Sequence, residues 1–280
     1  MSITFFASGN RRARTLYGAF AQGLSRHGLN MDVAHADNYT GIQSDVAVFY
    51  GLVGNLKRLY HEYRAAGKTT IFFDLGYWGR LDDGRYLGYH RVVVNGLHTV
   101  INGDQFYPDD RVEKFNINLH PMKRKGSHIV LAGQSAKASW VYDLEPEEWE
   151  HKAIQKIRKE TEMPIYYHPK LSWRDAKPID GTIYWPQPID ELLDDAWALV
   201  THHSNSSLLA LSKGVPIFIE DGIASGELYG RSNISQLMGP QYPDLLTLRN
   251  LFSGAAYWQW KVSEIAEGSL WGYLKSKGFV

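Results

Sequence analysis

A run of polar residues follows an apolar segment in the second half of the chain. Residues 198–201 have the character of a buried strand, and residues 206–213 have that of a helix ending at Gly214. The polar residues between them are His202, His203, Ser204, Asn205 and Ser206. A helix start offers free N–H groups, which suit a phosphate. Ser204 or Asn205 could instead simply cap the helix, but the two adjacent histidines favour the phosphate site.

Two further polar segments follow predicted strands of the same half. His168 and Lys170 come directly after strand 165–167, where Lys170 would neutralise charge on a departing nucleotide and His168 would donate to phosphate or ribose. The alternative is a surface lysine and a histidine packed under a loop. The turn Gly133, Gln134 and Ser135 follows strand 128–131 and lets a ligand approach the backbone, which is supporting evidence only.

Candidates for a catalytic base lie in the first half of the chain. Asp74 ends a strand, whereas Asp83 and His90 follow in a segment rich in glycine and tyrosine. If the nucleotide is the leaving group of a group transfer, an enzyme that inverts configuration needs such a base to deprotonate the acceptor hydroxyl. We rank the candidates in the order Asp74, Asp83, His90. Each aspartate could instead cap a turn, as Asp before Gly commonly does.

Acceptor-binding candidates also lie in the first half. Asn10, Arg11 and Arg12 open the first helix, where the arginines could contact an acceptor phosphate or be solvated, and solvation is the favoured interpretation. Aromatic residues make up 13% of the chain, more than its core requires. Since sugar rings pack their C–H faces on aromatic rings, we assign Tyr77 and Trp78 to the acceptor side.

These residues need a scaffold of alternating strands and helices, and the sequence supplies one. The predicted strands are residues 3–7, 45–50, 69–73, 91–94, 128–131, 165–167, 198–201 and 216–219. The predicted helices include a first one that ends at His27-Gly28, then residues 56–66, 145–161, 189–195 and 206–213, with a helical tail over 245–272. Such alternation predicts parallel sheets, because parallel neighbours need crossover connections.

A charged, Pro-containing stretch ending in Lys123-Arg124-Lys125-Gly126 is typical of a linker. We therefore predict an acceptor-side Rossmann-like domain over residues 1–122, a nucleotide-sugar donor domain over 123–245, and a C-terminal helical tail over 246–280 that packs back on both. The fold class is α/β, with two Rossmann-like halves facing a cleft.

Composition narrows the function classes. Thirty basic residues balance thirty acidic ones, so the chain has no net charge that would attract a polyanion. The absence of cysteine excludes disulfides and thiolate sites. The sequence has no HExxH, Walker-type or Gly-x-Ser-x-Gly motif and no clear Asp-x-Asp at a strand end. We expect no metal and no cofactor besides a donor substrate. No apolar run approaches a membrane span, and we expect a cytoplasmic protein without a membrane partner.

The second half, from about residue 128 to 219, resembles the donor domain of GT-B glycosyltransferases. Bacterial sialyltransferases and capsule-type Kdo transferases carry a His-Pro pair after one strand and a serine-rich turn after another, both on the donor nucleotide. His168-Pro169 and residues 204–207 are similar to these. The general base of those enzymes lies in an acidic-acidic-Gly motif, which Asp82-Asp83-Gly84 resembles.

A likeness over nearly the whole chain is to glycosyltransferases of tailed bacteriophages. It is carried by residues 74–80, 88–96, 200–205, 214–218 and 258–260. Several phage enzymes glycosylate hydroxymethylated pyrimidines, so the resemblance implies DNA modification in a host cytoplasm, with duplex DNA as the partner. The arginines at positions 11, 12 and 14 and the basic run 123–125 are the local patches that could contact a DNA backbone.

The function predicted is transfer of a sugar from a nucleotide-sugar donor, expected to be UDP-linked, to an acceptor hydroxyl of a 5-hydroxymethylpyrimidine in phage DNA. A transferase for a surface or capsular glycan is one alternative, and an enzyme similar to sugar-nucleotide 2-epimerases is another. A non-catalytic protein that retains the nucleotide pocket is a third.

Overall fold

The computed structural model describes residues 1–84 and 86–280. The chain divides into a first unit, Met1–Thr99 with Ala256–Val280, and a second unit, Val100–Ala255. The sequence placed the first boundary at residue 122 instead. Residues 100–122 belong with the second unit because their backbone bonds to it: the N–H of Ile101 donates to Ile223 O (3.1 Å), and that of His120 donates to Ser212 O (2.9 Å).

The first unit is built on a six-stranded sheet in the order β11-β5-β4-β3-β1-β2. Its strands are β1 (Ile3–Ala7), β2 (Asp32–His35), β3 (Val46–Tyr50), β4 (Thr69–Leu75), β5 (Tyr89–Val94) and β11 (Gln259–Lys261). β1 to β4 are mutually parallel. At one side of the sheet, β5 is antiparallel to β4, and β11 is antiparallel to β5. All five residues of β3 are buried, as expected for a strand covered on both faces.

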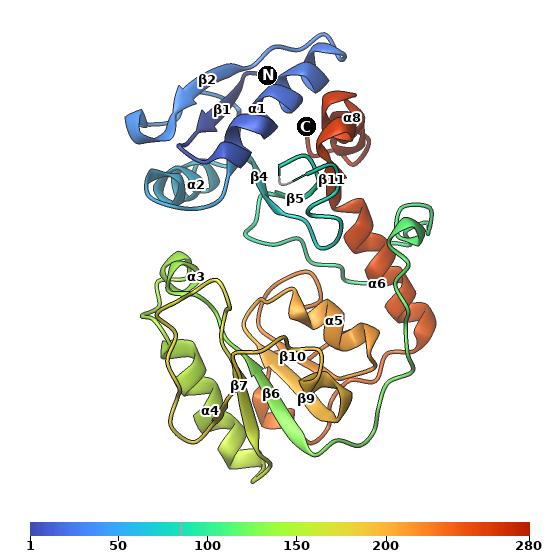
Figure 1. Cartoon of the computed structure of the whole chain (residues 1–280). Helices are drawn as coiled ribbons and strands as arrows, with labels where there is room; N and C mark the ends of the chain where they lie inside the picture. The colour runs from blue at the N-terminus through green and yellow to red at the C-terminus, as the bar shows by residue number, and fades with distance from the viewer. Residues whose placement is uncertain (85) are drawn as a thin grey trace. The chain divides into compact units, whose positions relative to one another are not determined.

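Helices cover this sheet, and two of them come from the end of the chain. They are α1 (Arg11–Ser25), α2 (Asn55–Ala65), α7 (Val262–Ala266) and α8 (Ser269–Ser276). The blue α1 and the red α8 lie side by side in Figure 1. Gly23 of α1 lets this tail approach closely, because a Cβ there would lie well inside 3.0 Å of the Ile265 carbonyl oxygen. The tail is therefore part of the first unit.

The prediction of a continuous helical tail over residues 245–272 is wrong. Helix α6 (Leu245–Tyr257) ends before β11, whose Gln259 and Trp260 are buried and pair with β5. Burying these side chains on the sheet outweighs the local preference for helix. The sequence also missed β2, in which three of four residues are exposed and no apolar run marks the strand.

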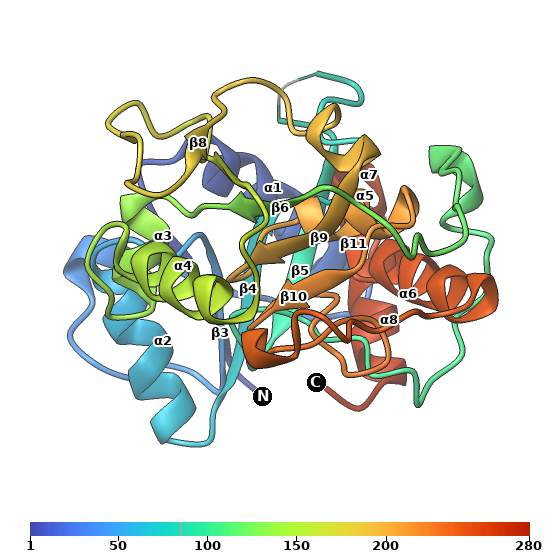
Figure 2. The ribbon, with the colours of Figure 1, turned by 90° about the horizontal axis from the view of Figure 1, so that it is seen from below.

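The second unit holds a five-stranded, wholly parallel sheet in the order β10-β9-β6-β7-β8. Its strands are β6 (His128–Ala132), β7 (Ile165–His168), β8 (Ile183–Tyr184), β9 (Ala196–Thr201) and β10 (Ile217–Ile219). Its helices are α3 (Ala136–Val141), α4 (Glu148–Glu160), α5 (Ser206–Ser212) and most of α6. Figure 2 shows β9 between β6 and β10.

Short 3-10 helices complete the chain at Ala36–Asn38, Glu113–Phe115, Leu192–Asp194 and Ile234–Gln236. The third of them stands where residues 189–195 were predicted to be helical. None of the helices in the described ranges is long and apolar enough to cross a bilayer.

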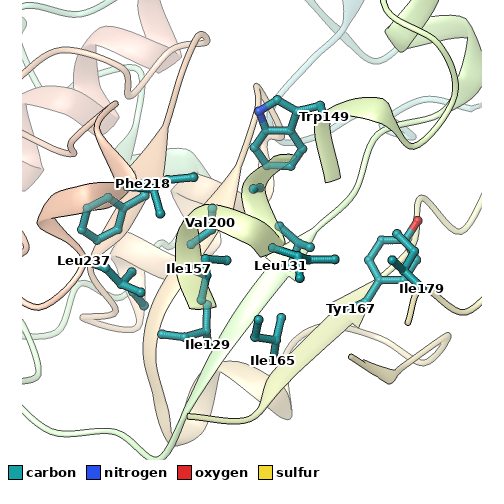
Figure 3. Packing of buried hydrophobic residues seen from close by; sticks show 14 residues of the cluster. Ile129, Leu131, Trp149, Ile157, Ile165, Tyr167, Ile179, Val200, Phe218 and Leu237 are labelled. Atoms are coloured by element: carbon teal, nitrogen blue, oxygen red, sulfur yellow. The ribbon is translucent and has the colours of Figure 1, made fainter. Parts of the chain in front are cut away.

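Figure 3 shows the core of the second unit. Trp149 and Ile157 of α4 pack onto Leu131 of β6, Tyr167 of β7 and Val200 of β9, and all five side chains are buried. The apolar residues of α4 recur at helical spacing, which places one face of the helix on the sheet. This core fixes the carboxyl ends of β6, β7 and β9, from which the predicted donor residues extend.

Candidate functional site

Three predicted polar segments lie at one edge of the second sheet. They are residues 133–135 after β6, residues 168–170, which begin with the last residue of β7, and residues 202–206 after β9. These three strands are adjacent and parallel. Two hydrogen bonds join their starts: Thr201 Oγ1 donates to Ala132 O (2.9 Å), and the Gly133 N–H donates to His168 O (2.9 Å). In open parallel sheets, ligands bind outside these carboxyl ends. The structure therefore brings together the segments assigned to the donor.

The turn after β9 presents hydroxyl groups. Ser204 Oγ accepts hydrogen bonds from the Ser206 N–H (3.2 Å) and from Ser206 Oγ (2.9 Å), so Ser204 has the capping role that was the alternative prediction. Asn205 makes no side-chain cap bond. Residues 203–206 are half-buried and accessible. Because α5 has only seven residues, its dipole contributes little, and the side-chain hydroxyls are the groups that suit an anionic ligand.

His202 is a packing residue rather than an exposed ligand donor. Its ring is 7% exposed and lies 4.3 Å from the ring centroid of Tyr142 and 5.8 Å from that of Trp149. Burial lowers the pKa of His202, although the carboxylates of Glu220 and Asp221 oppose this. The neutral ring fits an aromatic environment, so His202 supports the turn from beneath.

His203 is the accessible member of the histidine pair. It stacks on Tyr142 with ring centroids 5.0 Å apart, and its Nδ1 lies 2.9 Å from Nδ1 of His202. One nitrogen of this bond must donate and the other accept, so the two rings cannot both be protonated at Nδ1. The pair therefore carries at most one full positive charge while this bond persists.

His168 has a defined tautomer. Its Nδ1 lies 3.2 Å from the Trp185 carbonyl oxygen, which can only accept, so Nδ1 carries the proton. Burial lowers the pKa of His168, and the charge of Lys170 adds to this. In the neutral ring Nε2 is an acceptor, which suits a ribose hydroxyl; donation to phosphate requires the imidazolium. Lys170 itself is exposed.

Buried polar groups lie beneath the turn after β6: Gln134 was selected from the sequence, whereas Glu150 and Tyr167 were not. Glu150 is fully buried, and its Oε1 accepts from the Gln134 N–H (2.7 Å). Burial raises the pKa of the Glu150 carboxyl. Within the described chain, Glu150 Oε2, the Tyr167 hydroxyl and both amide atoms of Gln134 have no hydrogen-bond partner. Such groups are costly unless paired, so they mark a site that water or a ligand completes.

The neighbouring residues of this turn are structural. Gly133 packs against the Tyr167 ring, where a Cβ would meet Cε2 at 2.6 Å. Ser135 caps α3, because its Oγ accepts from the Ala138 N–H (3.3 Å).

Two carboxylates after β10 also belong to this sheet edge. Asp221 Oδ2 accepts from the Tyr142 hydroxyl (2.7 Å), and Glu220 Oε1 accepts from Trp149 Nε1 (2.9 Å). The sequence analysis did not select them, although they directly follow the predicted strand 216–219. The rule applied to the other three segments would have found them. It could not find Tyr142 or Glu150, which are placed by helix packing.

The burial of His202 predicts a pH-dependent stability. Its pKa is lowered from an ordinary value of 6.5, so its contribution is fully present above that pH and is lost as the pH falls through the lowered value. We expect His202→Gln to reduce the fall in Tm between about pH 7.5 and about pH 5.5. The matched control is His61→Gln, at an exposed position on α2. Thermal melts over a pH series test this, and an unchanged slope in His202→Gln would contradict it.

In the first unit, Asp74 lies near the end of β4 (Thr69–Leu75), as the sequence predicts. It lies on β4 opposite Arg91 of β5, and its Oδ2 accepts from the Arg91 guanidinium at 2.9 Å. The Asp74 side chain is 37% exposed. His90, which precedes Arg91 on β5, is only 2% exposed, and burial lowers its pKa. Asp74 is therefore the accessible member of this pair.

Asp83 lies in an exposed turn with a left-handed backbone (φ 57°) and forms an ion pair with Lys261 of β11 at 2.6 Å. This geometry matches the turn-forming alternative and contributes a link between the turn and the tail.

The acceptor-binding candidates have mixed environments. Asn10 caps α1 by accepting from the Arg12 N–H (2.9 Å), and Arg11 is exposed. Tyr77 is buried, and its N–H and that of Trp78 donate to Gln259 Oε1. Arg12 lies over the Tyr86 ring, 5.7 Å from its centroid. Arg80 and Arg91 were not selected from the sequence; Arg91 is buried and Arg80 is half-buried.

No protein-family model and no curated protein matches the chain. Solved structures do. KpsC, beta Kdo 2,4 transferase, from Thermosulfurimonas dismutans is 11% identical over 92% of this chain and 91% of that chain, with a TM-score of 0.55. KpsC, beta Kdo 2,7 transferase, from the same organism is 11% identical over 99% and 100%, with a TM-score of 0.53.

At this identity the likeness concerns the fold. It confirms the predicted α/β class with two Rossmann-like units: the chain has the GT-B-type fold of glycosyltransferases.

Proposed function

We propose that the protein is a glycosyltransferase whose second unit binds a nucleotide sugar at the carboxyl edge of its sheet. The observation that carries this is the convergence of residues 133–135, 168–170 and 202–206 on three adjacent strands. The GT-B-type fold supports the same assignment.

The donor's groups are matched by residue chemistry. Ser204 offers a hydroxyl donor for the diphosphate, because its Oγ accepts from Ser206 and its own hydrogen is left to donate. Lys170 and His203 offer positive or polar donors. Neutral His168 offers an acceptor for a ribose hydroxyl. Charge on the leaving diphosphate is then stabilised by side chains, which is our reason for proposing a metal-independent reaction. The donor that we propose is UDP-linked.

Asp74 is our first candidate for the catalytic base, ahead of Asp83 and His90. Both aspartates are ion-paired, Asp74 with Arg91 and Asp83 with Lys261, and His90 is buried. Asp74 ranks first because the pairing of β4 with β5 fixes its position, whereas Asp83 lies in an exposed turn. The guanidinium of Arg91 holds the Asp74 carboxylate in one orientation. A positioned carboxylate that can reach solvent is what deprotonation of an acceptor hydroxyl requires.

Two acceptors are proposed. The resemblance to phage enzymes favours a 5-hydroxymethylpyrimidine in DNA, with the enzyme acting in a host cytoplasm. The fold likeness to two Kdo transferases favours a surface or capsular glycan. A 2-epimerase-like reaction differs from both because it needs no acceptor.

The test is an assay of the full chain with UDP-, GDP-, CMP- and dTDP-sugars, each with hydroxymethylated duplex DNA, with unmodified DNA, with an oligosaccharide mixture or alone. Product that requires hydroxymethylated DNA supports the first acceptor, and product that requires the oligosaccharide supports the second. An altered sugar formed from donor alone supports the epimerase. Binding without turnover under every condition would overturn the enzyme assignment.

A further inference from the structure

The carboxyl edge of the first sheet gathers an excess of positive side chains. We define the arginine cluster as Arg12, Tyr50, Asp74, Tyr77, Arg80 and Arg91, all of the first unit. Arg80 is half-buried. Its burial lowers its pKa, Asp74 opposes this, and the charge of Arg91 adds to it. The Asp74 carboxylate accepts from Arg91 at 2.9 Å. The cluster thus sets three guanidinium groups against one carboxylate.

The members of the arginine cluster act on one another. The pKa of the Tyr50 hydroxyl is raised by burial and by Asp74, while Arg12 and Arg91 oppose this, and Arg12 also hydrogen-bonds to that hydroxyl. The pKa of Tyr77 is raised to about 12 by burial, with Arg91 opposing. Guanidinium groups stay protonated when buried, so their mutual repulsion persists unless an anion joins them.

Two polar atoms of the cluster lack a counterpart. Arg12 Nε is buried and has no hydrogen-bond partner within the described chain. The Tyr77 hydroxyl accepts from the Arg91 guanidinium, which cannot accept in return, so the hydroxyl proton has no acceptor among the described residues. The Tyr77 residue is only 7% exposed. Buried donors without acceptors destabilise a fold and are rare in native proteins. Both atoms can donate, so the group that would satisfy them is an acceptor.

The start of α1 also has an excess of positive charge. Its first turn contains Arg11 and Arg12 and no acidic residue, although the positive end of a 15-residue helix favours acidic side chains. A local preference that is broken in this way is typical of a functional site.

We propose that the arginine cluster binds one small oxyanion, a carboxylate or a phosphate, carried by the acceptor. Guanidinium groups form bidentate bonds with both anions, and one such anion would balance much of the excess charge. The assignment of this anion to the acceptor rests on the proposed function. The anion site itself does not depend on it.

The test is thermal melting of the full chain with inorganic phosphate or with D-glucuronate, at constant ionic strength set with NaCl. We expect either anion to raise the Tm by about 2–4 °C at tens of millimolar, because a ligand that binds only the folded state stabilises it. Arg12→Gln should abolish this rise, and Arg14→Gln, which removes an exposed arginine from the same helix, should preserve it. The anion giving the larger rise is the one that the arginine cluster prefers.

Without added anion, Arg12→Gln relieves repulsion but also loses the bond to the Tyr50 hydroxyl and the contact with the Tyr86 ring, so the anion-dependent rise is the readout and each variant is compared with itself. The variant Ser204→Ala/Ser206→Ala should retain the rise, since it alters only the second unit. An absent rise in the wild type, an equal rise in Arg12→Gln, or a rise lost in the serine variant would overturn the proposal. Failure of sugar transfer would leave these melting results unchanged, so the two proposals can fail separately.

Discussion

Gly23→Ala should lower the free energy of unfolding by about 2–3 kcal/mol, although alanine favours helix over glycine. Gly23 faces the C-terminal tail, and a Cβ there would be pressed against the backbone carbonyl of Ile265 and would lie 3.3 Å from Cα of Gly268. Neither atom belongs to a flexible side chain, so α1 and α7 must separate. Urea unfolding followed by circular dichroism measures the change.

The same helix supplies a control of opposite sign. Gly18 is exposed, with nothing within 4 Å of the position of a Cβ. Gly18→Ala should therefore stabilise the protein by about 0.5–1 kcal/mol through helix propensity alone. Equal effects of the two substitutions would mean that the tail does not dock on α1.

The second large effect concerns the donor. Ser204→Ala/Ser206→Ala should weaken binding of the nucleotide sugar by about 10–100-fold, since hydrogen bonds to charged groups contribute about 1.5–3 kcal/mol each. The variant also loses the bond from the Ser206 N–H to Ser204 Oγ, so a modest loss of stability of about 1 kcal/mol is expected as well. Titration calorimetry on the variant, below its melting temperature, measures the dissociation constant.

Ser212→Ala is the matched control. This serine lies at the other end of α5, where its Oγ donates to Leu209 O (2.8 Å). Its removal should leave the dissociation constant unchanged. If the double serine variant bound the donor as tightly as the wild type, the turn after β9 would not hold the diphosphate.

The sequence predicts the fold well where burial leaves a local signal. Residues 3–7 form the predicted strand with the same bounds, and residues 128–131 fall one residue short of β6. Both are apolar runs closed by small or polar residues, which is the pattern of a strand buried on both faces. The ends of β6, β7 and β9 are predicted to within one residue, which is why the three donor segments could be selected.

Positions fixed by distant packing were not predictable in this way. His202 looks like a ligand donor in the sequence, and only the approach of Tyr142 and Trp149 turns it into a packing residue. Glu150 occupies the buried face of an amphipathic helix, where an acidic residue gives no local signal of its role. The arginine cluster joins residues nearly eighty positions apart, through strand pairings that a single sequence does not reveal.

Hydrogen exchange of the full chain, with and without a saturating nucleotide sugar, tests the central claim most directly. We predict slowed exchange in peptides covering residues 133–135, 168–170 and 202–206, because a bound donor shields and orders the carboxyl ends of β6, β7 and β9. Protection confined to other segments, or no protection with any of the UDP-, GDP-, CMP- and dTDP-sugars, would contradict the assignment of this sheet edge to the donor.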